Sequence, residues 1–170
     1  HNLGMALQAQ GNTETAMAEF RAALALQPDL ESAEHHLANR LADAGRLDEA
    51  IAHYLAALRL DPNHAESYNG LGICYAMQGK LPEAERQFRE AIAMYDATLP
   101  ADHTTTAIAH IKLGRTLLRQ RRFTEAAPET LAGYEVISAT ASPGNSFLRA
   151  ARIDLAAIYG RARPVPGVGY

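Results

Sequence analysis

The sequence has only one cysteine, Cys74, no tryptophan, and few aromatic residues of any kind. A single cysteine excludes an internal disulfide and a cysteine-based zinc site. No apolar run approaches the roughly 18 residues of a membrane span, so we expect no membrane partner. The chain begins without the basic stretch and apolar block of a signal peptide, and also without an initiator methionine. We therefore expect a cytoplasmic protein whose N-terminus is missing from this sequence.

Alanine is the most abundant residue and occupies 34 of the 170 positions, whereas valine is rare. Alanine has the highest helix propensity, and its small side chain lets neighbouring helices approach closely. The composition therefore favours an all-α fold.

A leucine followed by a small residue recurs along the chain, with separations of 34, 34, 42 and 42 residues. These pairs are Leu3-Gly4, Leu37-Ala38, Leu71-Gly72, Leu113-Gly114 and Leu155-Ala156. Alanines and aromatic residues follow in the same register, at Ala16, Ala50, Ala84 and Ala126 and at Phe20, Tyr54 and Phe88. Such regular self-similarity indicates a repeat architecture.

Each of the first three units divides into two helical stretches, which we expect to be joined by a turn at Gly11, Gly45 or Gly79. Glycine ends a helix readily because it adopts a left-handed backbone without steric cost. Pro28 and Pro62 end the first two units, since proline lacks the N–H that would continue a helix. The aromatic side chains are then expected to fill the gap to the next unit.

These residues resemble the tetratricopeptide repeat (TPR), whose pattern is W-x2-L-G-x2-Y, then A-x3-F, then P. The third unit fits best, with Tyr68, Leu71, Gly72, Tyr75, Ala84 and Phe88. The resemblance implies a helix–turn–helix unit that stacks into a right-handed superhelix. We therefore expect an all-α TPR solenoid of about nine helices.

From Asp96 onward the period lengthens, and a longer second helix followed by a P-x-D-H turn resembles the variant found in kinesin light chains. Thr130 and Gly133 replace the aromatic residue and the alanine in unit four, so the pattern does not define the packing there. We predict one solenoid over 1–170, with units 1–30, 31–64, 65–106 and 107–142, a capping helix at 143–163 and an irregular tail at 164–170. A fifth repeat cut short is the alternative to the cap.

No residue pattern in the sequence points to catalysis. No two histidines are spaced four apart, and neither an H-E-x-x-H motif nor a phosphate-binding glycine loop occurs. No serine lies in a nucleophile-elbow motif, and Cys74 is typical of a small buried apolar residue within a helix. We therefore predict no enzymatic activity, no cofactor and no metal site.

Stacked hairpins form an extended concave groove lined by their first helices, and helical spacing predicts which residues face it. The predicted peptide-binding groove comprises His35, Asn39, Asp43, Asn69, Ile73, Met77, Ile111, Lys112, Arg115 and Arg119. The same face includes His1, Met5 and Gln8 in the first unit, Leu118 in the fourth, and Ile153, Ala157 and Arg161 in the last helix. Amide and imidazole groups can hydrogen-bond a peptide backbone, while apolar residues form pockets for its side chains. A solvated face without a partner is the alternative.

Charge is unevenly distributed, with a net charge of −7 over residues 1–96 and +4 over residues 97–170. Lys112, Arg115 and Arg119 share one helix face and can pair with acidic side chains or a C-terminal carboxylate of a partner. The slightly acidic total and the lack of aromatic residues among the basic ones argue against nucleic acid. The carboxylate clamp of chaperone co-receptors is also disfavoured, because Gly70 and Ile108 stand where that clamp needs Asn and Lys.

The sequence thus predicts a non-enzymatic protein–protein interaction scaffold that binds an extended peptide or helix of a partner in its concave groove. We expect a monomer or weak self-association. The alternative is a regulatory or substrate-presenting arm of a larger enzyme, such as a glycosyltransferase or a Ser/Thr kinase, whose catalytic domain lies outside this sequence. The full reading frame would distinguish the two.

Overall fold

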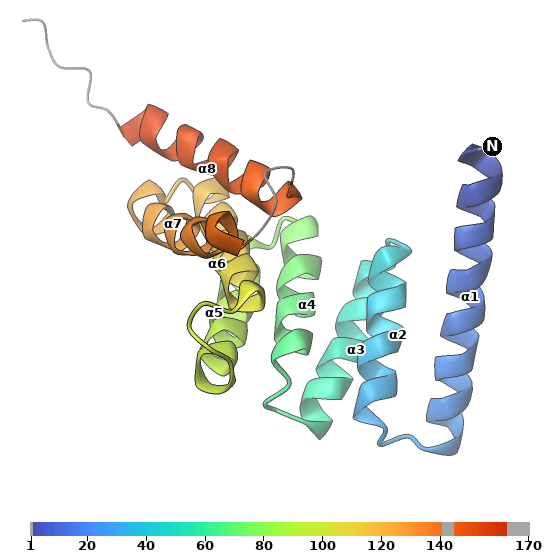
Figure 1. Cartoon of the computed structure of the whole chain (residues 1–170). Coiled ribbons are helices and arrows are strands. Elements are labelled where there is room, and N and C mark those ends of the chain that lie inside the picture. Colours follow the sequence, from blue (N-terminus) through green and yellow to red (C-terminus); the bar gives the residue numbers. More distant parts are fainter. Residues whose placement is uncertain (1, 141–144, 163–170) are drawn as a thin grey trace, which may run out of the picture. The chain divides into compact units, whose positions relative to one another are not determined.

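The structure, a computed structural model, describes residues 2–140 and 145–162. Over these residues it contains eight α-helices and no β-strand, which confirms the all-α prediction and is close to the expected number of helices (Figure 1). The chain divides into two compact units, His1–Lys80 and Leu81–Tyr170. The predicted single solenoid and its unit boundaries stay a prediction, and the tail at 164–170 lies outside the described residues.

The first of these compact units, called the first unit from here on, contains α1 (Asn2–Leu26), α2 (Glu31–Asp43), α3 (Leu47–Leu60) and α4 (Ala65–Met77). Each helix packs against the next one along the chain, and α4 also contacts α2. The core holds five residues of the recurring pattern, Leu37, Ala38, Ala50, Tyr54 and Leu71, together with Met17, Leu41 and Cys74. The repeat register therefore identifies most of the side chains that hold this part of the chain together.

Glycine ends α2 and α4, as the sequence predicts. Gly45 and Gly79 have φ values of +76° and +77°, in the left-handed region that favours glycine. The N–H of the following residue then bonds back across the turn, from Arg46 to the carbonyl of Leu41 and from Lys80 to that of Tyr75, both at 2.9 Å. These backward bonds satisfy carbonyls that the helix end leaves unpaired.

The predicted turn at Gly11 is wrong, because α1 runs without a break from Asn2 to Leu26. A glycine inside a helix costs only about 1 kcal/mol, which good helix formers on either side can offset. The stretches on both sides of Gly11 are rich in such residues, with alanine, leucine, methionine and glutamine. The predicted repeat over residues 1–30 is therefore one long helix instead of a helical hairpin.

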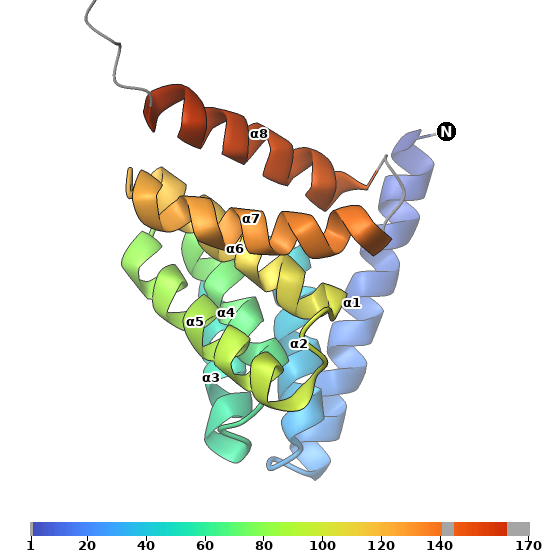
Figure 2. The same ribbon diagram turned by 60° about the vertical axis from the view of Figure 1, so that its left-hand side comes forward.

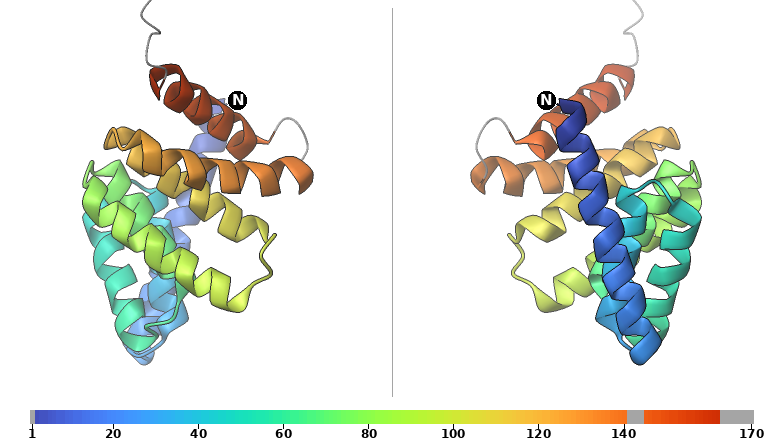
Figure 3. Two further views of the ribbon diagram at one scale, coloured as in Figure 1. Left: turned by 90° about the vertical axis from the view of Figure 1, so that its left-hand side faces the viewer. Right: turned by 90° about the vertical axis from the view of Figure 1, so that its right-hand side faces the viewer.

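The second unit contains α5 (Leu81–Thr98), α6 (Thr104–Arg119), α7 (Phe123–Thr140) and α8 (Ser146–Ala162). Figure 2 shows α8 alongside α7, and the last helix contacts both α6 and α7. Successive helices α5, α6 and α7 also pack against one another, as Figure 3 shows. The second helix of each helical hairpin is α3, α5 or α7. Of these, α5 and α7 are long, with 18 residues each, compared with 14 in α3.

Two glycines explain how α6 and α7 pack where the aromatic pattern fails. A Cβ added at Gly114 would lie 2.1 Å from Thr130 Oγ1, and one added at Gly133 would lie 2.3 Å from the carbonyl oxygen of Ala107. The small residues thus let the two backbones approach closely, and Thr130 is completely buried between them. In the predicted repeat over residues 107–142, close contact between α6 and α7 thus replaces the missing aromatic side chain.

Candidate peptide-binding surface

In the first unit, a chain of hydrogen bonds joins α2, α3 and α4. The Tyr54 hydroxyl donates to Asn39 Oδ1 at 2.6 Å, and Asn39 Nδ2 lies 3.0 Å from His35 Nε2. The other ring nitrogen, His35 Nδ1, lies 3.0 Å from Ser67 Oγ. Because an amide NH2 can only donate, we assign the proton of His35 to Nδ1, which then donates to Ser67.

The same chain continues through Ser67 to the start of α4. Ser67 Oγ lies 2.8 Å from His64 Nδ1, which also accepts the backbone N–H of Ser67 at 3.2 Å. His64 is thereby the N-cap of α4, and its remaining N–H is on Nε2, 3.4 Å from Glu31 Oε1. All donors in this chain point the same way, from Tyr54 towards His64, so that each bond polarises the next.

This arrangement explains the charge state of His35. Burial, followed by the nearby His64 and His36, lowers the pKa of His35 to about 4. A neutral imidazole is what the chain requires, because Nε2 must accept the bond from Asn39. His35 and Asn39, predicted as groove residues, therefore serve chiefly to join three helices.

Four other predicted groove residues of this unit lie nearer to solvent. Asp43 is exposed and pairs with Arg40 at 3.2 Å on the same helix. Asn69 and Ile73 on α4 are half-buried, and Met77, one turn further on, is 61% exposed. We refer to the exposed side of α2 and α4 around these residues as the α2–α4 face.

In the second unit the prediction that Ile111 lines the groove is wrong. Its side chain is only 2% exposed and lies in a core cluster with Ile137, Leu148 and Ala151. Two of these residues belong to α8, which covers the position that helical spacing alone assigns to the groove. A ligand cannot reach Ile111 in this structure.

The basic residues of α6 lie at different depths. Burial lowers the pKa of Lys112 to about 8, so part of this lysine is neutral at slightly basic pH. Arg115 bonds Asp154 of α8 through Nε at 2.9 Å and through a terminal nitrogen at 2.8 Å. Arg119 is exposed one turn further on, and Ile153 on α8 is 62% exposed. We refer to this exposed side as the α6–α8 face.

The remaining positions of the predicted face are less informative. Leu118 and Ala157 are half-buried. The side chains of His1, Met5, Gln8 and Arg161 lie outside the part of the chain whose side chains the structure describes.

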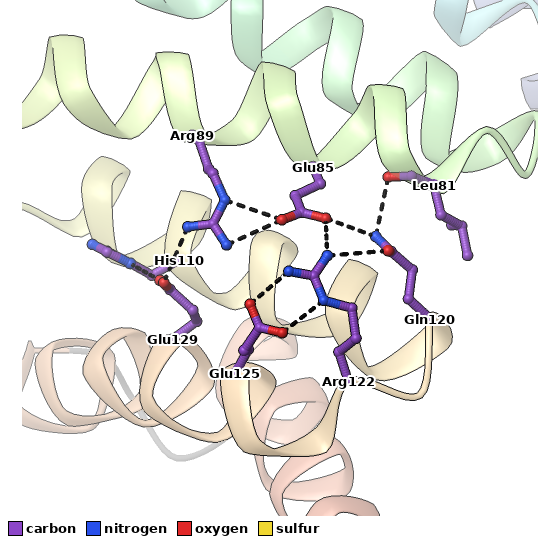
Figure 4. A network of polar contacts seen from close by, with 8 residues as sticks. All are labelled: Leu81, Glu85, Arg89, His110, Gln120, Arg122, Glu125 and Glu129. Atoms are coloured by element: carbon purple, nitrogen blue, oxygen red, sulfur yellow. Dashed lines mark hydrogen bonds and ion pairs between the residues drawn. The ribbon is translucent and has the colours of Figure 1, made fainter.

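Sequence reasoning missed a polar network between α5, α6 and α7 (Figure 4). Its hub is Glu85, which accepts hydrogen bonds from Arg89 and Gln120, each at 3.1 Å, and a further bond from Arg122. Arg122 also holds Glu125 through two bonds of 2.7 and 2.5 Å. These contacts keep the pKa of the Glu85 carboxyl below its usual value in spite of partial burial. The i,i+3 and i,i+4 spacings gave a local signal, whereas the bonds between helices gave none.

A second missed feature is a pair of equivalent His–Glu contacts. His53 Nδ1 on α3 lies 2.5 Å from Glu34 on α2, and His110 Nδ1 on α6 lies 2.7 Å from Glu129 on α7. Glu34 and His110 both stand three residues before the repeat leucine, and His53 and Glu129 both stand three residues after the repeat alanine. The same site thus holds the pair in opposite orientations, a signal that is visible only after the repeats are aligned.

Two features are absent from the described residues. No group of three or more His, Cys, Asp or Glu side chains among them is placed to hold a metal ion. None of the described helices has a stretch long and apolar enough to cross a membrane.

Three family models of the tetratricopeptide repeat match the sequence, over residues 29–97, 84–146 and 1–30. No curated protein matches it. Several solved structures share the fold at low sequence identity, so that they support the fold alone.

Three of these structures show the range of the similarity. YrrB, a TPR protein with an unusual peptide-binding site, matches with a TM-score of 0.68 at 21% identity, covering 84% of this chain and 66% of its own. BtubC from P. vanneervenii matches with a TM-score of 0.80 at 21% identity, over 91% of this chain and 68% of its own. A putative kinesin light chain of Podosopora anserina with nearly identical TPR-like repeats gives a TM-score of 0.70 at 19% identity, over 94% and 83%. This chain therefore spans just under two thirds of YrrB.

Proposed function

Because this chain belongs to the tetratricopeptide repeat family, we propose that it is a non-enzymatic scaffold that binds an extended peptide or a helix of a partner protein. The binding surfaces are the α2–α4 face of the first unit and the α6–α8 face of the second. Stacked helical hairpins present such surfaces because their first helices line one side of the array. YrrB, a protein of the same fold, has a peptide-binding site, which supports peptide binding as the kind of function proposed.

The observation that carries the proposal is the exposure of two large apolar side chains at repeat positions assigned to binding. Met77 on α4 is 61% exposed and Ile153 on α8 is 62% exposed, one on each face. A single exposed apolar residue is ordinary on a protein surface. Here the positions, and not the exposure alone, support binding, because the repeat register places both side chains on the first-helix side.

The neighbouring polar groups indicate what the partner offers. On the α6–α8 face, Arg115 and Arg119 stand one turn apart on α6, and the bond from Arg115 to Asp154 brings them next to the helix that carries Ile153. A segment with an apolar side chain and a nearby carboxylate fits this combination, because Arg119 adds a positive charge beside the pair that Arg115 forms with Asp154. On the α2–α4 face, Ile73 and Met77 offer apolar contact, while Asn69 and Asp43 are polar.

The proposal is tested with peptides selected against the whole chain from a random display library. Their affinities are measured by isothermal titration calorimetry for the wild type and for Met77→Ser and Ile153→Ser. Loss of a buried apolar contact is expected to weaken binding about ten- to a hundredfold, because burying such a side chain contributes about 1.5–3 kcal/mol. Each peptide is expected to respond to at least one of the two substitutions.

Two matched controls come from the second helices. Leu60 on α3 is 43% exposed and Leu131 on α7 is 37% exposed, and neither lies on a first-helix face. Leu60→Ser and Leu131→Ser are expected to leave every affinity unchanged. If these controls weaken binding while Met77→Ser and Ile153→Ser do not, the assignment of the surfaces is wrong.

A further inference from the structure

The second unit also contains a cleft of about 210 Å³ that belongs to neither face described above. Its apolar lining comes from Ile92 and Ala93 on α5 and from Leu113 on α6. Two carboxylates, Asp96 on α5 and Glu129 on α7, lie among the other lining residues. For comparison, a cavity of about 150 Å³ accommodates a benzene ring, so the cleft has room for one side chain.

The two carboxylates differ in how they are held. Glu129 accepts a bond from His110 at 2.7 Å and lies 3.8 Å from a terminal nitrogen of Arg89, as Figure 4 shows. Asp96 is exposed and makes no hydrogen bond or ion pair with any of the described residues. Glu129 is thus fixed in position, whereas the carboxylate of Asp96 remains available to a ligand.

The surrounding charges favour a positively charged ligand. The lining itself holds the carboxylates of Asp96 and Glu129, the guanidinium of Arg89 and the imidazole of His110. Arg89 bonds Glu85, and Glu85 and Glu125 both bond Arg122. Both arginines already bond carboxylates of this network. Negative charge therefore exceeds positive charge locally, which attracts cations and repels anionic ligands.

The length of α5 brings Asp96 to the cleft. Repeat alignment places Phe88 of α5 at the position of Tyr54 in α3, and hence Met94 at the position of Leu60, where α3 ends. Because α5 continues to Thr98, it has an additional turn that the shorter helix lacks, and Asp96 lies in that turn. A unit with the shorter second helix would have no carboxylate at this place.

We propose that this cleft binds an arginine side chain of a protein partner. The methylene stem lies on the exposed Ala93 and beside Ile92, and the guanidinium contacts the carboxylates of Asp96 and Glu129. A planar guanidinium suits this site because it donates to carboxylates in pairs and its stem buries well on apolar surface. The site goes beyond the scaffold function, because the second helices α5 and α7 contribute to it and not only a first helix.

The test uses the whole chain labelled with ¹⁵N and titrated with N-acetyl-arginine amide at constant ionic strength. The neutral isostere N-acetyl-citrulline amide is the matched ligand. Arginine is expected to shift the amide signals of Ala93 to Asp96, and citrulline is expected to shift them far less at the same concentration. Asp96→Asn should weaken arginine binding about three- to tenfold, the range for a charge-assisted bond near the surface.

Two further variants separate the cleft from general charge attraction. Ala93→Leu fills the cleft without changing charge and is expected to abolish the shifts. Asp102→Asn removes an exposed carboxylate that does not line the cleft, and it is expected to leave binding unchanged. Equal responses to arginine and citrulline, or full affinity in Asp96→Asn, would overturn the proposal, as would preferential binding of N-acetyl-glutamate amide at these signals. Because the titration does not involve the first-helix faces, its failure would leave the scaffold function untouched.

Discussion

Replacing Gly133 by alanine should destabilise the second unit, although alanine is the better helix former. An ideal Cβ at this position would lie 2.3 Å from the carbonyl oxygen of Ala107 and 2.6 Å from Cγ1 of Ile111. The first of these atoms belongs to the backbone of α6, so a side-chain rotation cannot relieve the clash. The two helices α6 and α7 must instead move apart.

The size of the effect follows from two opposing contributions. Overpacking a close contact costs about 1–3 kcal/mol, and more where backbone has to move. The higher helix propensity of alanine returns about 1 kcal/mol. Because the clashing atom belongs to the backbone, the cost lies in the upper part of this range, and the net expectation is a loss of about 1–2 kcal/mol in the free energy of unfolding.

Gly160 in α8 provides the matched control, because a Cβ added there would meet nothing within 4 Å. Gly160→Ala should therefore stabilise the protein by about 0.5–1 kcal/mol through helix propensity alone. Urea unfolding followed by circular dichroism at 222 nm measures both variants. If Gly133→Ala is as stable as Gly160→Ala, the close approach of α6 and α7 is refuted.

Three further predictions concern the first unit. Glu34→His and His53→Glu should each lower the free energy of unfolding of this unit by about 1 kcal/mol. The double variant should recover most of the loss, because the second unit holds the same pair in the opposite orientation. A double variant that loses as much as the two single variants together would contradict this expectation. The lowered pKa of His35 means that, as pH falls from about 6.5 to about 4, the unfolded chain takes up a proton before the folded chain does. The free energy of unfolding should therefore fall by about 2 kcal/mol across this pH range, after allowance for partial exposure of the ring. His35→Gln should lack this contribution when urea unfolding is measured at the two pH values. Burial raises the pKa of the Cys74 thiol to about 11, so iodoacetamide at pH 8 should label it only in urea, and rapid labelling of the native protein would show that the thiol is accessible.

The repeat register predicted the fold well because it records where helices touch. Tyr54 was expected to fill the gap to the next unit, and its ring lies so close to Gly70 on α4 that a Cβ there would be 2.3 Å from the ring. Gly45 and Gly79 end their helices as predicted, because a left-handed residue is a local requirement that glycine meets. Gly11 does not, since the cost of a glycine within a helix is small enough for its neighbours to offset.

The candidate surface was harder to predict, because helical spacing identifies a face without showing what covers it. Ile111 is on the predicted face, yet α8 packs over it. His35 and Asn39 are also on that face, but they bond to Ser67 and Tyr54 from the neighbouring helices. Such contacts connect residues up to 32 positions apart, and no pattern within a single helix indicates them.

The most direct test of the scaffold function maps a bound peptide onto the helices. A peptide selected against the whole chain is titrated into protein with ¹³C-labelled methyl groups, and the signals of Met77 and Ile153 are compared with those of Leu60 and Leu131. We expect the signal of Met77 or of Ile153 to shift on binding, while the signals of the two leucines of the second helices stay unchanged. Shifts confined to Leu60 and Leu131 would contradict it, because the peptide would then lie on the opposite helices of the repeats.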